Sequence, residues 1–189
     1  MKRRGHWNES PQAATPAAHT QAPVAPDHRR REKEELRDEF DEVLSRQDEH
    51  IDRVGWSVTV VLPTDDDPGA PFAYTVGLTQ HGFPELVIAG LAPPIARALL
   101  NDLAGRVYDQ ATRFRHGQRV ADLLAGYDAV IVNGAVTKAL YPGAAYARYG
   151  TDRVRLQQVV WPDRHGRFPW DPGYTHGPQT QPLIGRPDT

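Results

Sequence analysis

The stretch FAYTVGLTQHGFPELVIAGL, Phe72–Leu91, decides the fold. It opens with a run of aromatic and β-branched residues that ends at Leu78, and such residues favour a strand. After a Gly-Phe-Pro corner it continues with Glu85–Leu91, which is almost entirely apolar and therefore predicts a central strand buried on both faces. Gly77 interrupts the first strand, where a glycine indicates a bulge or the close approach of another backbone segment. The stretch predicts two buried strands and, near Gly77, an edge open to a ligand.

The sequence on either side of this stretch predicts one α+β domain over residues 55–189. A β-rich run precedes it, and a helix with prolines in its first turn follows it. The predicted elements are strands at 55–63, in two short pieces around His116-Gly117, at 127–136 and at 153–163, and helices at 92–109 and 137–150, the last broken at Pro142-Gly143. Antiparallel strands with interposed helices favour a mainly antiparallel sheet or a partly closed, split-type barrel with two or three packed helices.

The N-terminal part of the chain divides into two segments by composition. Residues 1–28 are rich in proline and alanine and poor in large apolar side chains, so they are predicted to be disordered. Residues 29–54 predict a charged amphipathic helix whose apolar stripe consists of Leu36, Phe40, Val43, Leu44, Ile51 and Val54. The stripe either packs on the domain of the same chain or pairs with a second copy as a short coiled coil, although Gln47 and His50 interrupt the seam.

Composition and charge argue against several classes of protein. The 189 residues include no cysteine, which excludes disulfides and thiolate chemistry and agrees with a cytoplasmic location. No apolar run is long enough to span a membrane, and no apolar segment follows the basic start, so neither a membrane protein nor a secreted one is predicted. Residues 55–189 carry twelve basic and twelve acidic side chains. This neutral balance argues against nucleic acid as a partner.

The sequence indicates neither a metal site nor a common catalytic motif. The histidines lack the i, i+3 or i, i+4 spacing that places two imidazoles on one face of a helix. The chain also has no G-x-S-x-G elbow, no P-loop and no G-x-G-x-x-G motif. The usual hydrolase and nucleotide-binding mechanisms are therefore not predicted, and no catalytic residue is assigned.

Two clusters of side chains have the chemistry of a ligand site. The basic cluster consists of Arg113, Arg115, His116 and Arg119. It suits a phosphate, although a solvated hairpin is the simpler interpretation. The aromatic cluster consists of Trp161, Phe168, Trp170 and Tyr174. Such rings either form a stacking surface for a ligand or pin an irregular loop onto the core.

Five segments of the sequence occur in a recognisable order: GWSVTVV, PFAYTVGL, GFPELVIAGL, QVVWPDRHGRFPW and QPLIG. In order and spacing they resemble a bacterial family, domain of unknown function 4262, over roughly Ile51 to Gly185. The resemblance implies a single domain with two hallmark segments, Phe72–Leu78 and Trp161–Asp163. The resemblance implies no catalytic residues, because none is established for the family, so it leaves open whether the protein is an enzyme.

The order of elements also resembles the opening of split-barrel flavin reductases. There the segment corresponding to Thr75–Thr79 lies along the flavin, so the resemblance implies a flavin or another small phosphate-containing ligand. The candidate ligand-binding residues are Thr75, Gly77, Thr79, His81, Arg113, Arg115, Trp161, Asp163 and Trp170. Asp163, His165 and His81 are the candidate acid–base groups. The alternative function is a non-catalytic interaction module that acts through the helix at 29–54 and the aromatic loop.

Overall fold

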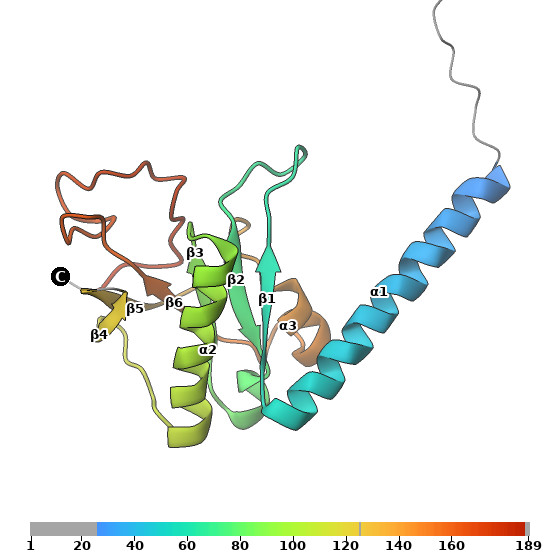
Figure 1. Ribbon diagram of the computed structural model, residues 1–189, viewed down its shortest axis with the longest axis horizontal. Helices are drawn as coiled ribbons and strands as arrows, with labels where there is room; N and C mark the ends of the chain where they lie inside the picture. The colour runs from blue at the N-terminus through green and yellow to red at the C-terminus, as the bar shows by residue number, and fades with distance from the viewer. Residues whose placement is uncertain (1–25, 125, 188–189) are drawn as a thin grey trace, which may run out of the picture. The chain divides into compact units, whose positions relative to one another are not determined.

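The computed structural model describes residues 26–124 and 126–187. Its first unit ends at Glu42 and its second begins at Val43. The helices are α1 (Pro26–Val54), α2 (Pro93–Gln110) and α3 (Gly143–Tyr149), with one 3-10 turn, η1 (Leu78–His81). The strands are β1 (Ser57–Val61), β2 (Phe72–Val76), β3 (Glu85–Ala89), β4 (Arg119–Leu124), β5 (Tyr127–Gly134) and β6 (Leu156–Val160) (Figure 1).

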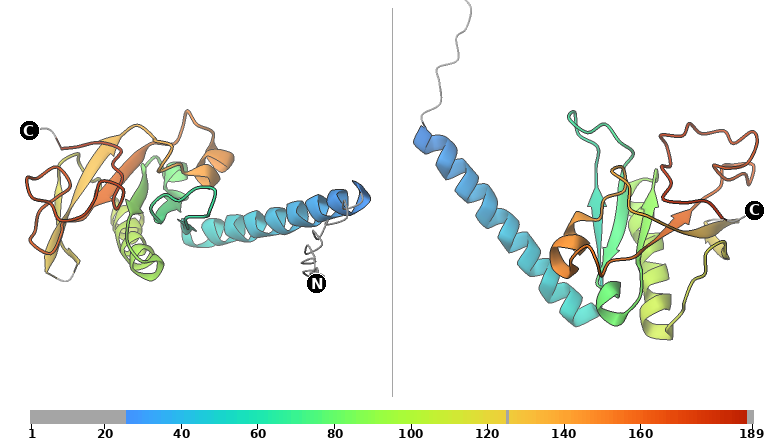
Figure 2. Two further views of the ribbon diagram at one scale, coloured as in Figure 1. Left: turned by 90° about the horizontal axis from the view of Figure 1, so that it is seen from above. Right: turned by 180° about the vertical axis from the view of Figure 1, so that it is seen from behind.

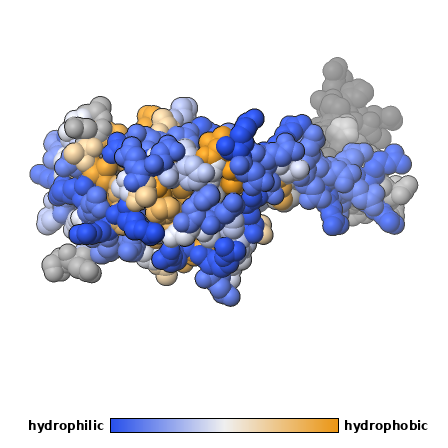
Figure 3. All heavy atoms as spheres, turned by 90° about the horizontal axis from the view of Figure 1, so that it is seen from below, coloured by the Kyte–Doolittle hydropathy of each residue, from blue (hydrophilic) through white to orange (hydrophobic). Residues whose placement is uncertain are grey.

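The segment that was predicted to be disordered falls mostly outside the described residues, which begin at Pro26. Within them, α1 starts at Pro26 rather than Arg29. No helix in the described part of the chain combines the length and the apolar character needed to cross a membrane. On the face drawn in Figure 3, hydrophilic residues predominate and the apolar ones form small separate patches.

The second unit is built on one six-stranded sheet in the order β1-β2-β3-β6-β5-β4. Neighbouring strands are antiparallel except β3 and β6, which run parallel with Glu85 opposite Leu156. The sheet curls into a half-barrel (Figures 1 and 2). The predicted α+β class is therefore confirmed. The sheet is mixed rather than purely antiparallel because β6, the last strand in the sequence, inserts between β3 and β5.

Two hydrophobic cores cover the two faces of the sheet. Alternation along β3 sends Leu86 and Ile88 to one core and Val87 and Ala89 to the other. The core on the first face is completed by α2, which buries Ala96, Leu100, Leu103, Ala104 and Val107. Every residue of β2 and of β3 is buried. The structure thus confirms the buried central strand that the apolar run predicted.

The C-terminal end of α1 is anchored to the second unit, of which it forms the start. Ile51 is only 2 % exposed. Gln47 donates hydrogen bonds from Nε2 to the hydroxyls of Ser57 and Thr59 of β1, at 2.7 and 2.9 Å. The polar residue that interrupts the apolar stripe therefore ties the helix to the sheet, and this end of the stripe packs on its own chain.

Helix α3 adds a second attachment for the same end of α1. The guanidinium of Arg148 forms ion pairs with Asp48 and Asp52, the latter at 3.0 Å. Towards its N-terminus α1 has a different environment, since Leu36 is 65 % exposed and Val43 is 55 % exposed. The stripe is thus buried at one end and open to solvent further along.

Of the two short strands predicted around His116-Gly117, only the second forms, as the start of β4, and the two do not make a hairpin. Strand β4 begins only at Arg119 and pairs with β5, not with the residues before His116. The backbone of Gly117 and Gln118 hydrogen-bonds to Ile131 of β5 instead, at 2.8 and 2.9 Å. A longer-range antiparallel partner has replaced the local hairpin that the turn chemistry suggested.

The helix predicted over 137–150 is confined to its second half. Thr137 and Leu140 form an isolated bridge, and α3 begins only after Pro142. Proline has no amide hydrogen to donate to the preceding turn, and its fixed φ suits the start of a helix. Pro142 therefore initiates a short helix instead of interrupting a longer one.

Candidate functional site

The segment around Gly77 surrounds the carboxylate of Glu85, the first residue of β3. The Thr75 hydroxyl donates to Oε2 at 2.6 Å, and the amides of Gly77 and Thr79 donate to Oε1 at 3.1 and 2.9 Å. Thr75 also accepts a hydrogen bond from the amide of Leu86 at 2.8 Å. We call this arrangement the Glu85 cradle. The polar groups that predicted a ligand edge thus bind a carboxylate of the same chain.

Burial raises the pKa of Glu85, because desolvation disfavours the charged carboxylate. The hydrogen bonds from Thr75, Thr79 and Gly77 favour the charged form and offset part of that shift. The Thr79 hydroxyl also lowers the pKa of Glu85, although it makes no hydrogen bond with a described residue. The folded protein therefore takes up a proton at Glu85 more readily than the unfolded chain does.

Backbone geometry requires glycine at position 77. Its φ is +135°, in a region that residues with a Cβ rarely adopt. A Cβ atom there would also collide with the carbonyl oxygen of Gly55 and the Cα of Trp56. This confirms the close backbone approach that the sequence indicated, and the Gly55-Trp56 backbone fills that side of the segment.

The predicted basic and histidine ligands lie on the surface, not in the buried cradle. The Arg113 guanidinium is 4.7 Å from the centroid of the Phe83 ring. The His81 ring packs edge-on against Tyr108, with centroids 4.7 Å apart. Arg115 is exposed, and its backbone amide donates to the side chain of Gln118 at 2.8 Å. These exposed side chains do not form one site with the buried Thr75.

Asp163 anchors the loop that follows β6. Its Oδ1 accepts hydrogen bonds from the amides of His165 and Arg167 at 2.8 and 3.0 Å, and its Oδ2 accepts from the Thr175 amide and hydroxyl at 3.0 and 2.9 Å. Burial by itself would raise the pKa of Asp163, but these hydrogen bonds outweigh it and hold that pKa well below its usual range. His165 is exposed, and its Nε2 accepts from Arg164 at 3.0 Å. The Asp163 carboxylate is therefore ionised and engaged within its own loop.

Most of the aromatic cluster pins this loop to the core. Trp161 is buried and donates from Nε1 to the carbonyl of Ala89 at 2.8 Å. Phe168 is buried, and Trp170 stacks on it with ring centroids 5.1 Å apart and planes 4° apart. These contacts follow the second interpretation of the cluster, in which the rings hold the loop. Tyr174 has a different role, because it lines a pocket.

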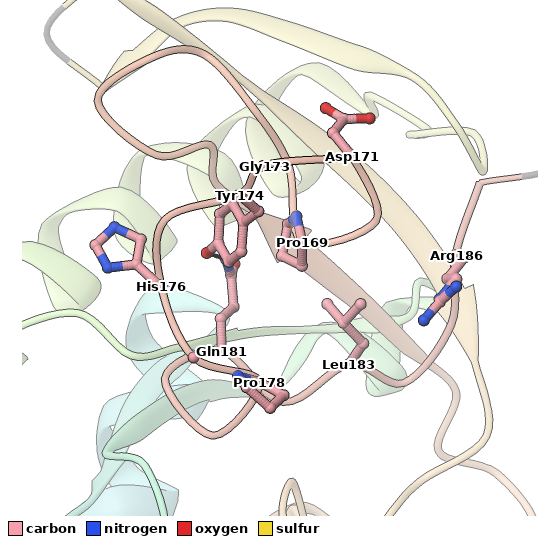
Figure 4. Close-up of a pocket in the computed structure, with 10 residues that line it drawn as sticks. Pro169, Asp171, Gly173, Tyr174, His176, Pro178, Gln181, Leu183 and Arg186 are labelled. Atoms are coloured by element: carbon pink, nitrogen blue, oxygen red, sulfur yellow. Dashed lines mark hydrogen bonds between the residues drawn. The ribbon is translucent and has the colours of Figure 1, made fainter.

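The pocket beside Tyr174 has a volume of about 440 Å³ (Figure 4). Its lining comes from the two loop segments that follow β6: Pro169, Asp171, Gly173, Tyr174, His176, Gly177, Pro178, Gln181, Leu183 and Arg186. None of the nine predicted ligand-binding residues belongs to this lining. A volume of this size falls in the range of roughly 300–1,000 Å³ that is typical of small-molecule sites.

Gln181 fixes the polar end of this pocket. Its side chain accepts from the Trp161 amide at 2.9 Å and donates to the Trp161 carbonyl at 3.0 Å. It also donates to the Tyr174 hydroxyl at 3.1 Å. Burial raises the pKa of Tyr174, and the hydrogen bond from Gln181 offsets part of the shift. The phenol is therefore protonated at neutral pH, and no described residue accepts its proton, because the hydrogen bond with Gln181 is one that the hydroxyl accepts.

Comparison with known families places most of the folded part of the chain in one described family. Residues 50–175 match the family described as domain of unknown function (DUF4262). The chain belongs to DUF4262. No curated protein and no solved structure matches it. The resemblance seen in the sequence is thereby confirmed, and the DUF4262 match includes both hallmark segments, the Glu85 cradle and the first half of the pocket.

The pocket of this DUF4262 protein was missed from sequence for a physical reason. Its lining joins residues on both sides of the Gly-rich turn at Gly173, and spacing in the sequence does not reveal that contact. One signal was present, since Gln181 opens the QPLIG segment that carries part of the family resemblance. Asp171 and Arg186 are single charges in loops, and nothing in their sequence context distinguishes them from solvated residues. In the described part of the chain, no group of three or more His, Asp or Glu side chains is placed to hold a metal ion.

Proposed function

We propose that this protein binds a small organic molecule in the pocket of Figure 4. The observation that carries the proposal is the Tyr174 hydroxyl, which Gln181 holds at the pocket wall with its own proton free. A buried side chain that is fixed by three hydrogen bonds gives a binding site a rigid polar group. Pro169, Pro178 and Leu183 supply apolar surface beside it. This combination suits a ligand with an apolar body and polar ends.

The flavin that the fold resemblance implied has less support than a ligand in this pocket. The hydroxyl of Thr75 and the amides of Gly77 and Thr79 already bind Glu85. A flavin phosphate at that segment would have to displace a buried carboxylate and would meet its negative charge. The pocket, in contrast, has a hydroxyl with a free proton and needs no such rearrangement.

The proposal is tested by mapping where small probes bind. The ¹⁵N-labelled full-length protein is titrated with L-phenylalanine, N-acetyl-L-phenylalanine, L-phenylalaninamide, N-acetyl-L-phenylalaninamide and FMN, and amide chemical shifts are recorded. We expect at least one phenylalanine derivative to shift the amides of residues 173–186. Gly177→Trp, which places a large side chain at the pocket rim, should weaken that binding at least about tenfold. Position 177 has open space around its Cβ, so the fold should tolerate the change.

Ile95→Trp is the matched control, because Ile95 is an exposed residue of α2 and should leave binding unchanged. If none of the probes shifts the amides of residues 173–186, the proposed function is wrong. If FMN alone binds and shifts the amides of Thr75–Thr79, the flavin site is favoured over the pocket.

Self-association through α1 is a second candidate function, favoured by the exposed Leu36 and Val43. These residues are seven apart and lie on one side of the helix. The helix also begins with a basic run at 29–33, and an acidic run follows at 34–42. A second copy in antiparallel orientation would bring unlike charges together, so we propose a second copy of this chain as the partner.

Light scattering over a concentration series tests this candidate. We expect a dimer whose dissociation constant rises at least about tenfold in Leu36→Asp, since a buried leucine contributes roughly 1.5–3 kcal/mol. Ser45→Asp adds the same charge to another exposed position of α1. At each concentration its mass by light scattering should equal that of the wild-type protein. A wild-type protein that remains monomeric at every concentration would exclude the dimer.

A further inference from the structure

We propose that the ligand of the pocket in Figure 4 is an organic monoanion, a carboxylate with an apolar body, whose negative group pairs with Arg186. This inference rests on the proposed function, because it names the chemical class that the same pocket would take. Arg186 is a lining residue, and Figure 4 draws its side chain turned towards Leu183. A guanidinium therefore lies beside an apolar part of the pocket wall.

The guanidinium of Arg186 is available to a ligand. Arg186 is exposed, and it forms no hydrogen bond, ion pair or ring contact with another described residue. A second arginine beside the pocket, Arg167, already donates from Nη1 to the carbonyl of Gly173 at 2.8 Å. A guanidinium presents its donors in one plane, which matches the two oxygens of a carboxylate. A ligand carboxylate can therefore pair with Arg186 without displacing an existing partner.

Asp171, the acidic residue of the lining, does not oppose such a ligand. Figure 4 draws its carboxylate pointing away from the other lining side chains. Its Oδ2 accepts a hydrogen bond from the Phe168 amide at 2.8 Å, so this carboxylate serves the loop turn. Because no lining carboxylate faces the pocket, the charge of Arg186 is not balanced there and attracts a negative group.

Two further polar side chains favour a ligand that accepts hydrogen bonds. Gln181 uses both of its Nε2 protons, one for the Trp161 carbonyl and one for the Tyr174 hydroxyl, and its Oε1 accepts from the Trp161 amide. The Tyr174 hydroxyl has a proton that no described residue accepts. A donor at Tyr174 and a cation at Arg186 suit a molecule with a neutral acceptor, such as a carbonyl, in addition to its carboxylate.

A single unpaired arginine favours a singly charged group. A phosphate monoester carries a charge of about −1.5 to −2 at neutral pH, and Arg186 would balance only part of it. A carboxylate carries one negative charge and can accept two parallel hydrogen bonds from the guanidinium. Pro169, Pro178 and Leu183 would then lie beside the body of the ligand. An acid with an aromatic or branched aliphatic body fits this lining.

The four phenylalanine derivatives test which sign of charge the pocket selects, because they share one ring and differ in charge. N-acetyl-L-phenylalanine is an anion, L-phenylalaninamide a cation, L-phenylalanine a zwitterion and N-acetyl-L-phenylalaninamide neutral. We expect N-acetyl-L-phenylalanine to bind roughly three- to tenfold more tightly than its neutral amide, which has the same acetyl carbonyl and nearly the same size. L-phenylalaninamide should bind most weakly. Calorimetry on the full-length protein measures the four affinities.

Three variants assign the preference to its side chain. In Arg186→Gln, which removes the charge, the preference for N-acetyl-L-phenylalanine over its amide should disappear. Arg153→Gln is the matched control, because Arg153 is also exposed, lies outside the lining and changes the net charge by the same amount. Tyr174→Phe should weaken both acetylated probes alike and leave the ratio of their affinities unchanged, because the acetyl carbonyl is common to both.

Failure of this inference can be told apart from failure of the proposed function. Equal affinities for N-acetyl-L-phenylalanine and its amide, with shifts at residues 173–186, would overturn the anion and leave the proposed function standing. Tightest binding by L-phenylalanine or L-phenylalaninamide would likewise overturn it, because the pocket would then bind a positive charge. A preference that survives in Arg186→Gln would overturn the role of Arg186. Absence of binding by all four would overturn both the inference and the proposed function.

Discussion

Replacing Glu85 by alanine is expected to lower the free energy of unfolding by about 3–5 kcal/mol, because it leaves buried donors without an acceptor, each at a cost of roughly 1–3 kcal/mol. The stranded donors are the Thr75 hydroxyl and the amides of Gly77 and Thr79. The side chain of Glu85 is also fully buried, so alanine leaves a cavity. Chemical denaturation followed by circular dichroism measures the loss.

Glu85→Gln is the matched control, because glutamine has the same shape and its oxygen can still accept from the amides of Gly77 and Thr79. Only the partner of the Thr75 hydroxyl is lost, so the destabilisation should be clearly smaller than in Glu85→Ala. Equal stability of the two variants would contradict the role of the cradle.

Wild type and Glu85→Gln should also differ in how their stability depends on pH. Burial raises the pKa of Glu85, so the folded state binds this proton at a higher pH than the unfolded chain. As the pH falls from neutral towards the ordinary pKa of glutamic acid, wild type should therefore gain stability relative to Glu85→Gln, which cannot titrate. A stability difference that stays constant over this range would show that Glu85 does not titrate differently on folding.

Gly77→Ala is expected to cost about 3 kcal/mol or more, for two reasons that act together. The φ of +135° is strained for any residue with a Cβ, and the added atom would meet the backbone of Gly55 and Trp56, which cannot move as a flexible side chain could. Any backbone movement that relieves this clash should also disturb the Gly77 amide, which donates a hydrogen bond to Glu85. Thermal denaturation of the purified variant measures the effect.

Gly82→Ala separates these two causes. Gly82 also has a positive φ, of +78°, but a Cβ atom there would meet nothing within 4 Å. It should therefore cost only the conformational penalty, roughly 1 kcal/mol. If the two alanine variants proved equally stable, the close approach at Gly77 would have no energetic importance.

The central strands were predictable from sequence because they depend on local composition. The apolar run at Glu85–Leu91 and the aromatic and β-branched run before it need partners on both faces, whatever those partners are. The pairing of β4 with β5 was not predictable in the same way. The turn chemistry at His116-Gly117 suggested a local hairpin, and only the packing of the whole sheet decides that Gly117 and Gln118 meet Ile131.

The candidate site was predicted less well, and the reason lies in partners rather than in residue types. Thr75, Gly77 and Thr79 do form an anion-binding edge, as their chemistry suggested, but the carboxylate it binds comes from Glu85 a few residues later. Asp163 likewise has an unusual environment, which four donors of its own loop create. A sequence shows which groups can bind an anion, and only the fold shows whether the chain already supplies one.

The position of β6 has a consequence for how the protein is made. This strand is synthesised after the other five described strands, yet it lies in the middle of the sheet, where Glu85 pairs with Leu156, 71 positions later in the sequence. Until β6 leaves the ribosome, β3 and β5 each expose an unpaired edge. The strands β1, β2 and β3 cannot join the antiparallel pair β4-β5 before then, because β6 lies between the two groups. Contacts this distant along the chain slow folding, and open strand edges invite pairing with other chains. Completion of the sheet, and with it protection from aggregation, therefore waits until β6 has been synthesised.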